Sequence, residues 1–210
     1  LLARGETGFG CCGAAADVDD AKRVCERLGI AHYVSDMADI FASKVIRPYL
    51  DAYLGGTTPN PCVECNRSLK FGHLLALAEA WGCAAVATGH YARIENGRLL
   101  KALDPAKDQS YFLYSLNGRA LSRAEFPVGG MTKEAVRAKA RELGLKTADK
   151  VESMETCFVP GRDVRGFIAG SAGAGSPGLA PGPIRDREGR ELGRHTGLAS
   201  YTVGQRSGLG

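Results

Sequence analysis

The chain has 210 residues, of which 44% are hydrophobic and 24% are charged. This composition is that of a globular protein and excludes a disordered or fibrous chain. No apolar run approaches the ~20 residues that a membrane span requires, and the first residues lack the pattern of a signal peptide. The net charge of +4 permits a polyanionic partner but does not require one. We therefore expect a globular protein with no membrane partner.

Helix and strand patterns alternate in the first part of the chain. Apolar residues recur at helical spacing in three segments, and two short apolar runs between them are typical of strands. Pro48 should kink or split the second helix because proline has no backbone N–H. The expected elements are a helix at 17–28, a strand at 30–34, a helix at 37–54, a loop at 55–66, a helix at 71–81 and a strand at 83–88.

Turn and cap residues define the next elements along the chain. Asn96-Gly97 is a type I′ turn pair and predicts a hairpin over 91–102. A further helix is expected from Thr132 to Leu143, because Gly144 suits the position after its end. The alternation of strands and helices predicts an α/β domain with a mainly parallel sheet and flanking helices.

The composition changes after the first 160 residues. Glycine and proline become frequent, and a hairpin at 183–192 is expected to turn near Glu188-Gly189. We interpret residues 1–160 as the catalytic domain, 161–182 as a Gly/Pro-rich linker and 183–210 as the start of a β-rich domain.

The seven cysteines are odd in number, and the composition is not that of a small secreted scaffold. We therefore expect a cytoplasmic protein with reduced thiols, in which paired cysteines indicate metal or redox chemistry before structural disulfides. The cysteines assigned to packing or chance are Cys11, Cys12, Cys25 and Cys83.

Cys62 and Cys65 form a C-x-x-C pair directly before a predicted helix. Asn66 is a plausible N-cap, which would place Cys65 at the start of the helix, where backbone N–H groups favour a thiolate. The thiolate is the nucleophilic form of cysteine. The spacing alone leaves redox, metal-binding and incidental roles open.

A structural zinc site is not predicted, because such sites need four ligands and the four histidines are scattered along the chain. Cys157 could join Cys62 and Cys65 as the three thiolates of an iron–sulfur cluster with one open iron. The pattern alone favours a packing role for Cys157, since an isolated cysteine is usually buried.

Two further places carry polar residues near the predicted sheet. Thr88-Gly89-His90 ends a strand, and ligands of open α/β sheets bind beyond such ends. His90 could be catalytic, but a hydrogen-bonded structural histidine is commoner. The segment 107–110 precedes an aromatic run and is either a solvated turn or a contact to nucleic acid.

Four motifs together resemble the MnmA/TrmU family of tRNA-specific 2-thiouridylases. They are NPCVECN, ATGHYAR, KDQSYFLY and YTVGQRSGLG, and they occur in the family's order. The resemblance implies an adenine nucleotide alpha hydrolase-like fold of the PP-loop ATP pyrophosphatase type. It also implies a reaction on the wobble uridine, U34, of tRNA.

In that reaction ATP, with Mg²⁺, adenylates the uridine O2, and a cysteine persulfide then delivers sulfur to C2, giving 2-thiouridine and AMP. By resemblance, Cys65 is the nucleophile and Cys157 carries the persulfide, and the two form a transient disulfide. A cysteine desulfurase or a relay protein would supply the sulfur. Reaching C2 requires the base to leave its stack.

The resemblance also implies contacts to the substrates. Gly89 matches an ATP-binding glycine. The residues that match the segment touching the target base are Asn60, Pro61 and Cys62, and those that match a tRNA-binding segment are Lys107, Asp108 and Gln109.

The sequence departs from the family in two respects. Cys62 stands where many members have Asp, which provides a third thiol and keeps the [4Fe-4S]-dependent thiolase using Cys62, Cys65 and Cys157 as an alternative. A Gly-Ser-rich phosphate-binding loop is not found, and 5–10 (GETGFG) is not a convincing substitute. We therefore expect residues 1–210 to be an internal piece that is inactive on its own. An inactive RNA-binding fragment and a thioredoxin-like oxidoreductase remain alternatives.

Overall fold

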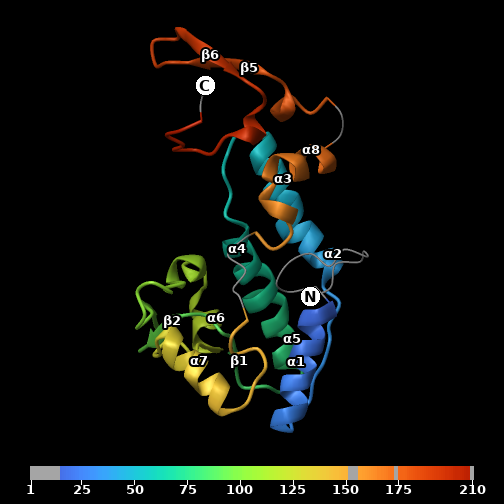
Figure 1. Ribbon diagram of the computed structural model, residues 1–210, viewed down its shortest axis with the longest axis vertical. Coiled ribbons are helices and arrows are strands. Elements are labelled where there is room, and N and C mark those ends of the chain that lie inside the picture. The colour runs from blue at the N-terminus through green and yellow to red at the C-terminus, as the bar shows by residue number, and fades with distance from the viewer. Residues whose placement is uncertain (1–14, 151–155, 173–174, 209–210) are drawn as a thin grey trace.

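The computed structural model describes residues 15–150, 156–172 and 175–208. The sequence features at 5–12, including Cys11 and Cys12, lie outside the described residues. Figure 1 shows an elongated molecule with a helical column through its middle. The hairpin β5–β6 lies at one end of this column, and the strands β1 and β2 lie near the other end.

The first helix, α1 (Ala15–Leu28), confirms the helix predicted from the apolar spacing. It ends at Gly29, whose φ of 67° is a conformation that glycine adopts without strain. The strand predicted at 30–34 is wrong. This segment is irregular, and Ile30, Tyr33 and Val34 are exposed. A β-strand requires a neighbour for its backbone hydrogen bonds, and no strand in the described part of the chain pairs with this segment.

The second predicted helix is continuous but changes its winding before Pro48. It consists of α2 (Ala38–Phe41), the π-helix η2 (Ala42–Ile46) and α3 (Arg47–Leu54). Pro48 cannot donate the hydrogen bond that an α-helix would need at this point. The predicted break therefore takes the form of a π-helical stretch within one helix, which is a recognised way to accommodate such a residue.

The third helical unit begins earlier than the sequence suggests. It consists of α4 (Pro61–Glu64), the π-helix η3 (Cys65–His73) and α5 (Leu74–Ala80). Asn60 is its N-cap, because the side-chain oxygen accepts a hydrogen bond from the Cys62 N–H at 3.1 Å. The expected N-cap at Asn66 is therefore wrong: this residue is buried inside the helix with 2% of its surface exposed.

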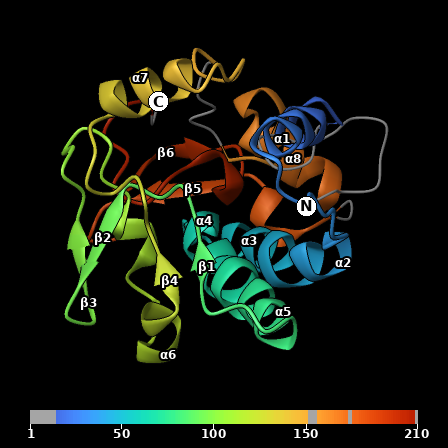
Figure 2. The ribbon, with the colours of Figure 1, turned by 90° about the horizontal axis from the view of Figure 1, so that it is seen from below.

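The parallel pairing that defines the α/β class is present and short. Strand β1 (Val86–Ala87) pairs in parallel with β4 (Ala124–Glu125), and Figure 2 shows the two strands side by side with α5 beyond β1. The α/β prediction is confirmed. In the described residues its parallel part comprises these two strands, and the other pairs are antiparallel.

The predicted hairpin around Asn96-Gly97 is also confirmed. Strands β2 (Ala92–Glu95) and β3 (Arg98–Lys101) pair in antiparallel register. Asn96 and Gly97 have φ values of 51° and 72°, as a type I′ turn requires. The chain then continues through the 3₁₀ turn η4 (Ser110–Leu113) and α6 (Gly118–Ser122) before it enters β4.

The helix predicted after Thr132 is confirmed as α7 (Lys133–Glu142), and the Thr132 side chain accepts a hydrogen bond from the Ala135 N–H at 3.2 Å. The segment interpreted as a linker is more ordered than expected. It contains the 3₁₀ turn η5 (Pro160–Arg162), α8 (Val164–Ser171) and the 3₁₀ turn η6 (Pro177–Leu179). Ile168 is completely buried, so this stretch is packed structure rather than an extended tether.

The last elements agree with the expected start of a β-rich region. Strands β5 (Gly182–Arg185) and β6 (Glu191–His195) form an antiparallel hairpin, followed by the 3₁₀ turn η7 (Leu198–Ser200). Gly189 in the turn has a φ of 86°, which suits the predicted turn position. No helix in the described ranges is long and apolar enough to cross a membrane.

Two hydrophobic clusters hold the fold together. The sheet cluster gathers around β1, β2 and β4 and contains Phe71, Leu75, Ala78, Val86, Ala92, Leu113, Leu116, Ala120 and Ala124. The helix cluster lies where α3, η3 and α8 meet and contains Val45, Tyr49, Tyr53, Leu69, Phe158, Val159, Ile168 and Ala199. The π-helix η3 contributes to both, with Leu69 in one and Phe71 in the other.

Candidate functional site

Cys65 is the first residue of η3, a full turn inside the helix rather than at its start. The electrostatic effect of a helix terminus falls off within the first turn, so the predicted thiolate stabilisation at Cys65 does not follow from its position. Cys62 occupies the first turn instead, and it is exposed to solvent. The cysteine at the start of the helix is therefore Cys62, whereas the sequence pattern predicted Cys65 there.

Cys157 lies directly before Phe158, which anchors this part of the chain in the helix cluster. Phe158 has 2% of its surface exposed, and its ring meets that of Tyr49 edge-on at a centroid distance of 5.0 Å. The Phe41 ring contacts it at 5.7 Å. Cys157 itself is half-buried and packs against the same cluster. Its position is therefore set by aromatic packing of the neighbouring residue.

Cys65 and Cys157 pack against the same cluster, the helix cluster. Both half-buried side chains pack against it, although the two residues are far apart in sequence. Cys65 lies one turn before Leu69, which is completely buried in the cluster. Both Cys65 and Leu69 therefore face the cluster from the same helix. Two thiols on one apolar surface are partly shielded from water.

A cavity of about 390 Å³ opens beside the C-x-x-C segment. Its size is in the range of small-molecule sites. It is lined by Val45, Pro48, Tyr49, Pro59, Asn60, Pro61, Val63, Glu64, Arg67, Tyr111, Tyr114 and Ser115. Asn60 and Pro61, which the resemblance assigns to the target base, thus form part of a concave surface. Cys62, Cys65 and Cys157 do not line it.

The segment from Asp108 to Ser110 is an internally bonded turn. The Asp108 carboxylate accepts hydrogen bonds from the Ala102 N–H at 2.9 Å and from the Ser110 hydroxyl at 2.9 Å. Partial burial acts to raise the pKa of Asp108, but these hydrogen bonds hold that pKa below its ordinary value. Asp108 therefore fixes the turn as an anion.

Gln109 is fixed in the same turn. Its side-chain oxygen accepts a hydrogen bond from the Tyr91 N–H at 2.9 Å, and its own N–H donates to the Tyr91 carbonyl at 2.8 Å. The oxygens of Asp108 and Gln109 thus hold the backbone that leads into η4. Through η4, this turn positions the exposed rings of Tyr111 and Tyr114 at the cavity.

The strand end at Gly89 is open on one side and packed on the other. A Cβ added to Gly89 would meet nothing within 4 Å, so a ligand can approach this backbone closely. His90 is buried against Phe71 and Phe126, and its Nδ1 lies 2.7 Å from the Thr88 hydroxyl oxygen. Burial, helped by the charge of Lys70, lowers the pKa of His90 to about 4. His90 is therefore a neutral, hydrogen-bonded packing residue.

The three candidate iron ligands are not gathered into a metal site. Within the described ranges, no group of three His, Cys, Asp or Glu side chains is placed to hold a metal ion. Cys62, Cys65 and Cys157 all belong to these ranges. The three thiols therefore do not form the ligand set of a cluster in this conformation.

The sequence did not indicate several residues of the cavity. Arg67, Tyr111 and Tyr114 carry no spacing signal, because their contribution depends on how η4 packs against the helix that carries Cys65. One contact makes this packing visible: the Asn66 side-chain N–H donates to the Phe112 carbonyl at 3.0 Å. The run of aromatic residues after position 110 was the available hint.

The parallel pair β1–β4 and the helices around it are those of an α/β domain, and the matching family model assigns this domain to the HUP class, whose fold is the adenine nucleotide alpha hydrolase-like fold of PP-loop proteins. Within this class, the chain belongs to the family described as tRNA methyl transferase HUP domain, which matches residues 3–161. A second family, described as tRNA methyl transferase PRC-barrel domain, matches residues 176–210.

The chain is similar to several proteins named tRNA-specific 2-thiouridylase MnmA. It is 51% identical to the one from Methylorubrum extorquens over 205 residues, which is 95% of this chain and 52% of the relative. It is 52% identical to the one from Chloroflexus aurantiacus over 206 residues, which is 95% of this chain and 56% of the relative. The chain thus spans about half the length of the curated relatives it matches.

Proposed function

We propose that this chain is the sulfur-handling part of an ATP-dependent enzyme that converts the wobble uridine of tRNA to 2-thiouridine. The observation that carries the proposal is the placement of Cys65 and Cys157 on one hydrophobic cluster, next to the cavity that contains Asn60 and Pro61. The names of the relatives supply the substrate and the reaction.

The first step of the proposed reaction uses ATP. The uridine O2 attacks the α-phosphorus of ATP, pyrophosphate leaves, and the oxygen becomes part of an adenylate that can depart as AMP. The open backbone at Gly89 supports an approach of the nucleotide at this strand end. Mg²⁺ would neutralise the phosphates, as it does in other ATP-using sites. The neutral, buried His90 would hold the turn without taking part in proton transfer.

The second step transfers sulfur. A cysteine desulfurase or a relay protein would load Cys157 with a persulfide, and the terminal sulfur would attack C2 of the adenylated uridine, expelling AMP. The Cys65 thiolate would then attack the Cys157 sulfur, so that 2-thiouridine leaves and a Cys65–Cys157 disulfide forms. An external thiol must reduce this disulfide before the next turnover. The shared apolar surface of the two thiols supports this exchange.

The free thiols of Cys25 and Cys83 support a reducing location, and we propose the cytoplasm. The domain limits at 160 and 182 remain proposals as well. We propose that tRNA contacts the turn that contains Lys107, Asp108 and Gln109. The side-chain oxygens of Asp108 and Gln109 already accept hydrogen bonds that hold this turn, so these two residues would act by fixing its shape.

The central test uses the full-length protein with single substitutions. Cys65→Ser and Cys157→Ser should each abolish 2-thiouridine, measured by mass spectrometry of digested tRNA. Cys83→Ser is the matched control, because this thiol is free, exposed and outside the helix cluster. It should retain activity. Substantial product from either of the first two variants would contradict the mechanism.

A second substitution separates the persulfide route from a cluster-dependent route. Cys62→Asp introduces the residue that many family members carry, and Cys62 is exposed, so the fold should tolerate the change. The persulfide route predicts an active variant and a colourless protein after anaerobic purification. An inactive variant, together with a brown wild-type protein that contains iron, would favour a cluster held by Cys62, Cys65 and Cys157.

A further inference from the structure

The cavity beside α4 has one wall made of two exposed tyrosines. Tyr111 and Tyr114 expose 66% and 67% of their surfaces, and their ring centroids lie 6.0 Å apart. Two neighbouring rings with this much exposed surface offer their faces to a ligand that can stack on them. The segment that carries them is held rigidly, because Leu113 between them is completely buried. A fixed, exposed aromatic wall is suited to stacking.

This wall is tied to the residue next to the proposed nucleophile. The Asn66 amide donates its hydrogen bond to the carbonyl of Phe112, which lies between the two tyrosines in sequence. Asn66 follows Cys65 directly and is almost completely buried. The distance between the tyrosine wall and the sulfur chemistry is therefore fixed by the helix itself.

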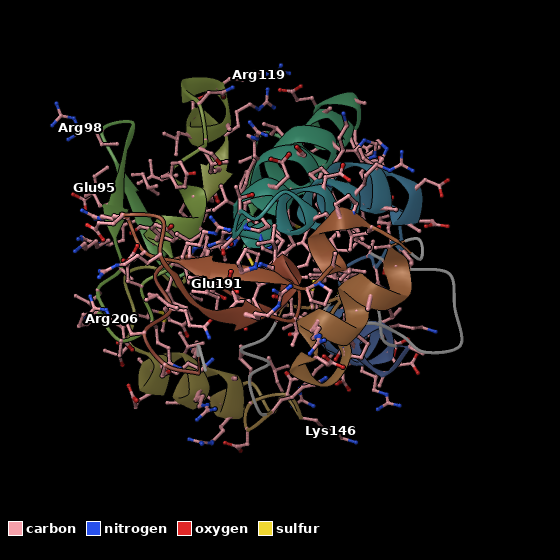
Figure 3. All side chains as sticks on the ribbon, turned by 90° about the horizontal axis from the view of Figure 1, so that it is seen from above. Glu95, Arg98, Arg119, Lys146, Glu191 and Arg206 are labelled. Atoms are coloured by element: carbon pink, nitrogen blue, oxygen red, sulfur yellow. The ribbon has the colours of Figure 1, made fainter. Side chains whose placement is uncertain are left out.

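The charge of the cavity lining is balanced. Arg67 is its cation and Glu64 its anion, and the two form an ion pair across one turn of the helix. The Glu64 carboxylate also accepts a hydrogen bond from Ser68. A phosphate would need an excess of positive charge. The labelled surface cations Arg98 and Arg119 project from the periphery in Figure 3 and do not line the cavity.

We propose that this cavity binds the unstacked base of the nucleotide next to the target uridine, with Tyr111 and Tyr114 as its stacking platform. A neutral, aromatic pocket with a few polar groups fits a nucleobase better than a phosphate group. Asn60, which lines the cavity, is available to the edge of that base. This inference rests on the proposed tRNA substrate.

The helix geometry explains why the target uridine itself would lie elsewhere. Pro61 and Glu64 are three residues apart and share the face that lines the cavity. Cys62 and Cys65 have the same spacing but start one residue later, so they lie on the adjacent face. Cys157, whose persulfide would attack C2, does not line the cavity either, so a base inside the cavity would not present its C2 to that sulfur. Its neighbour in the RNA, reaching past Asn60 and Pro61, would.

The test measures stacking directly in the full-length protein. Anticodon stem–loop RNAs carry the fluorescent base 2-aminopurine on either the 5′ or the 3′ side of the wobble uridine. Binding should quench one of the two positions. The double variant Tyr111→Ala/Tyr114→Ala should lose this quenching and bind at least ~5-fold more weakly, since stacking on an aromatic ring supplies a large part of single-strand affinity.

Two controls define the role of the rings. Tyr111→Phe/Tyr114→Phe keeps both rings and should retain the quenching, whereas a hydroxyl contact would be lost. Tyr33→Ala removes an exposed tyrosine that does not line the cavity, and it should bind RNA normally. Free AMP is added in a parallel experiment. Displacement of the 2-aminopurine signal by AMP would assign the cavity to a mononucleotide and overturn the flanking-base assignment.

The binding experiment needs neither ATP nor a sulfur donor, so it is independent of catalysis. Unchanged affinity and quenching in the alanine double variant would overturn the inference, even if the same protein makes 2-thiouridine. Ring-dependent quenching in a protein that makes no 2-thiouridine would support the inference and contradict the proposed reaction.

Discussion

The sheet cluster and the helix cluster differ in how far apart in sequence their residues lie. The sheet cluster is built from one continuous stretch between Phe71 and Ala124. The helix cluster joins Val45 and Leu69 to Phe158, Ile168 and Ala199. Local turns and caps assemble the first, whereas the second depends on segments that meet only after folding. The proposed sulfur chemistry lies on the second.

The largest expected difference between the two clusters comes from substitutions that open a cavity in each. Ile168→Ala and Leu113→Ala remove completely buried side chains from the helix cluster and the sheet cluster respectively. Each should lower the free energy of unfolding by ~2–5 kcal/mol, measured by urea denaturation. Only Ile168→Ala should speed the alkylation of Cys65 and Cys157 under native conditions. Equal alkylation in both variants would show that the cysteines are not protected by the helix cluster.

The free energy of unfolding should depend on pH through His90, which packs against Phe71 of the sheet cluster and against Phe126. Burial lowers the pKa of His90 from 6.5 to about 4, so the unfolded chain binds a proton more readily between these values. The contribution of His90 to the free energy of unfolding is therefore complete above pH 6.5. It is lost as the pH decreases toward 4, by at most about 3 kcal/mol. His90→Gln should flatten this slope in urea denaturation at several pH values. The exposed His73→Gln is the control and should keep it.

The helix caps allow a finer comparison. Asn60→Ala removes the cap of α4 and Thr132→Ala removes that of α7, and each should cost ~1 kcal/mol of unfolding free energy. The backbone N–H of Cys62 should exchange its hydrogen faster only in the first variant, as measured by hydrogen exchange. Asn60→Ser keeps a capping oxygen and should restore protection. Unchanged exchange in Asn60→Ala would mean that the start of α4 is held by other contacts.

The smallest expected effect on stability is at Gly89. Gly89→Ala adds a methyl group to open space and should change the unfolding free energy by less than ~0.5 kcal/mol. The KM for ATP in the full-length protein should nevertheless rise. Gly129→Ala is the contrasting variant, because its Cβ would overlap the Ala92 carbonyl oxygen, and it should be strongly destabilised. An unchanged KM in Gly89→Ala would remove the proposed ATP contact.

The elements that could be predicted are those that local chemistry determines. The Asn96-Gly97 turn and the Thr132 cap specify their own backbone and required no knowledge of the rest. The strand at 30–34 could not be judged in this way, because a strand exists only when a neighbour pairs with it. The helix before Cys65 shows a missed local signal. Proline is favoured at the first helical position, so Asn60-Pro61 indicated the true start.

The site was predictable in part. The resemblance named Cys65 and Cys157, but their packing against one cluster depends on how Phe158 packs against Tyr49, which no local pattern encodes. The cavity was missed for the same reason. Tyr111 and Tyr114 face it only because a side chain from a distant helix, Asn66, holds the backbone between them.

The nine-residue π-helix that begins at Cys65 has a consequence for insertions and deletions. A π-helix contains more residues per turn than an α-helix, so it sets the rotation of α4 relative to α5. Deleting one residue between Asn66 and Phe71 would rotate Cys65 by roughly a quarter of a turn relative to the sheet cluster. The fold could survive such a change while the nucleophile turned away from its partner. Over this stretch, the number of residues matters as much as their identity.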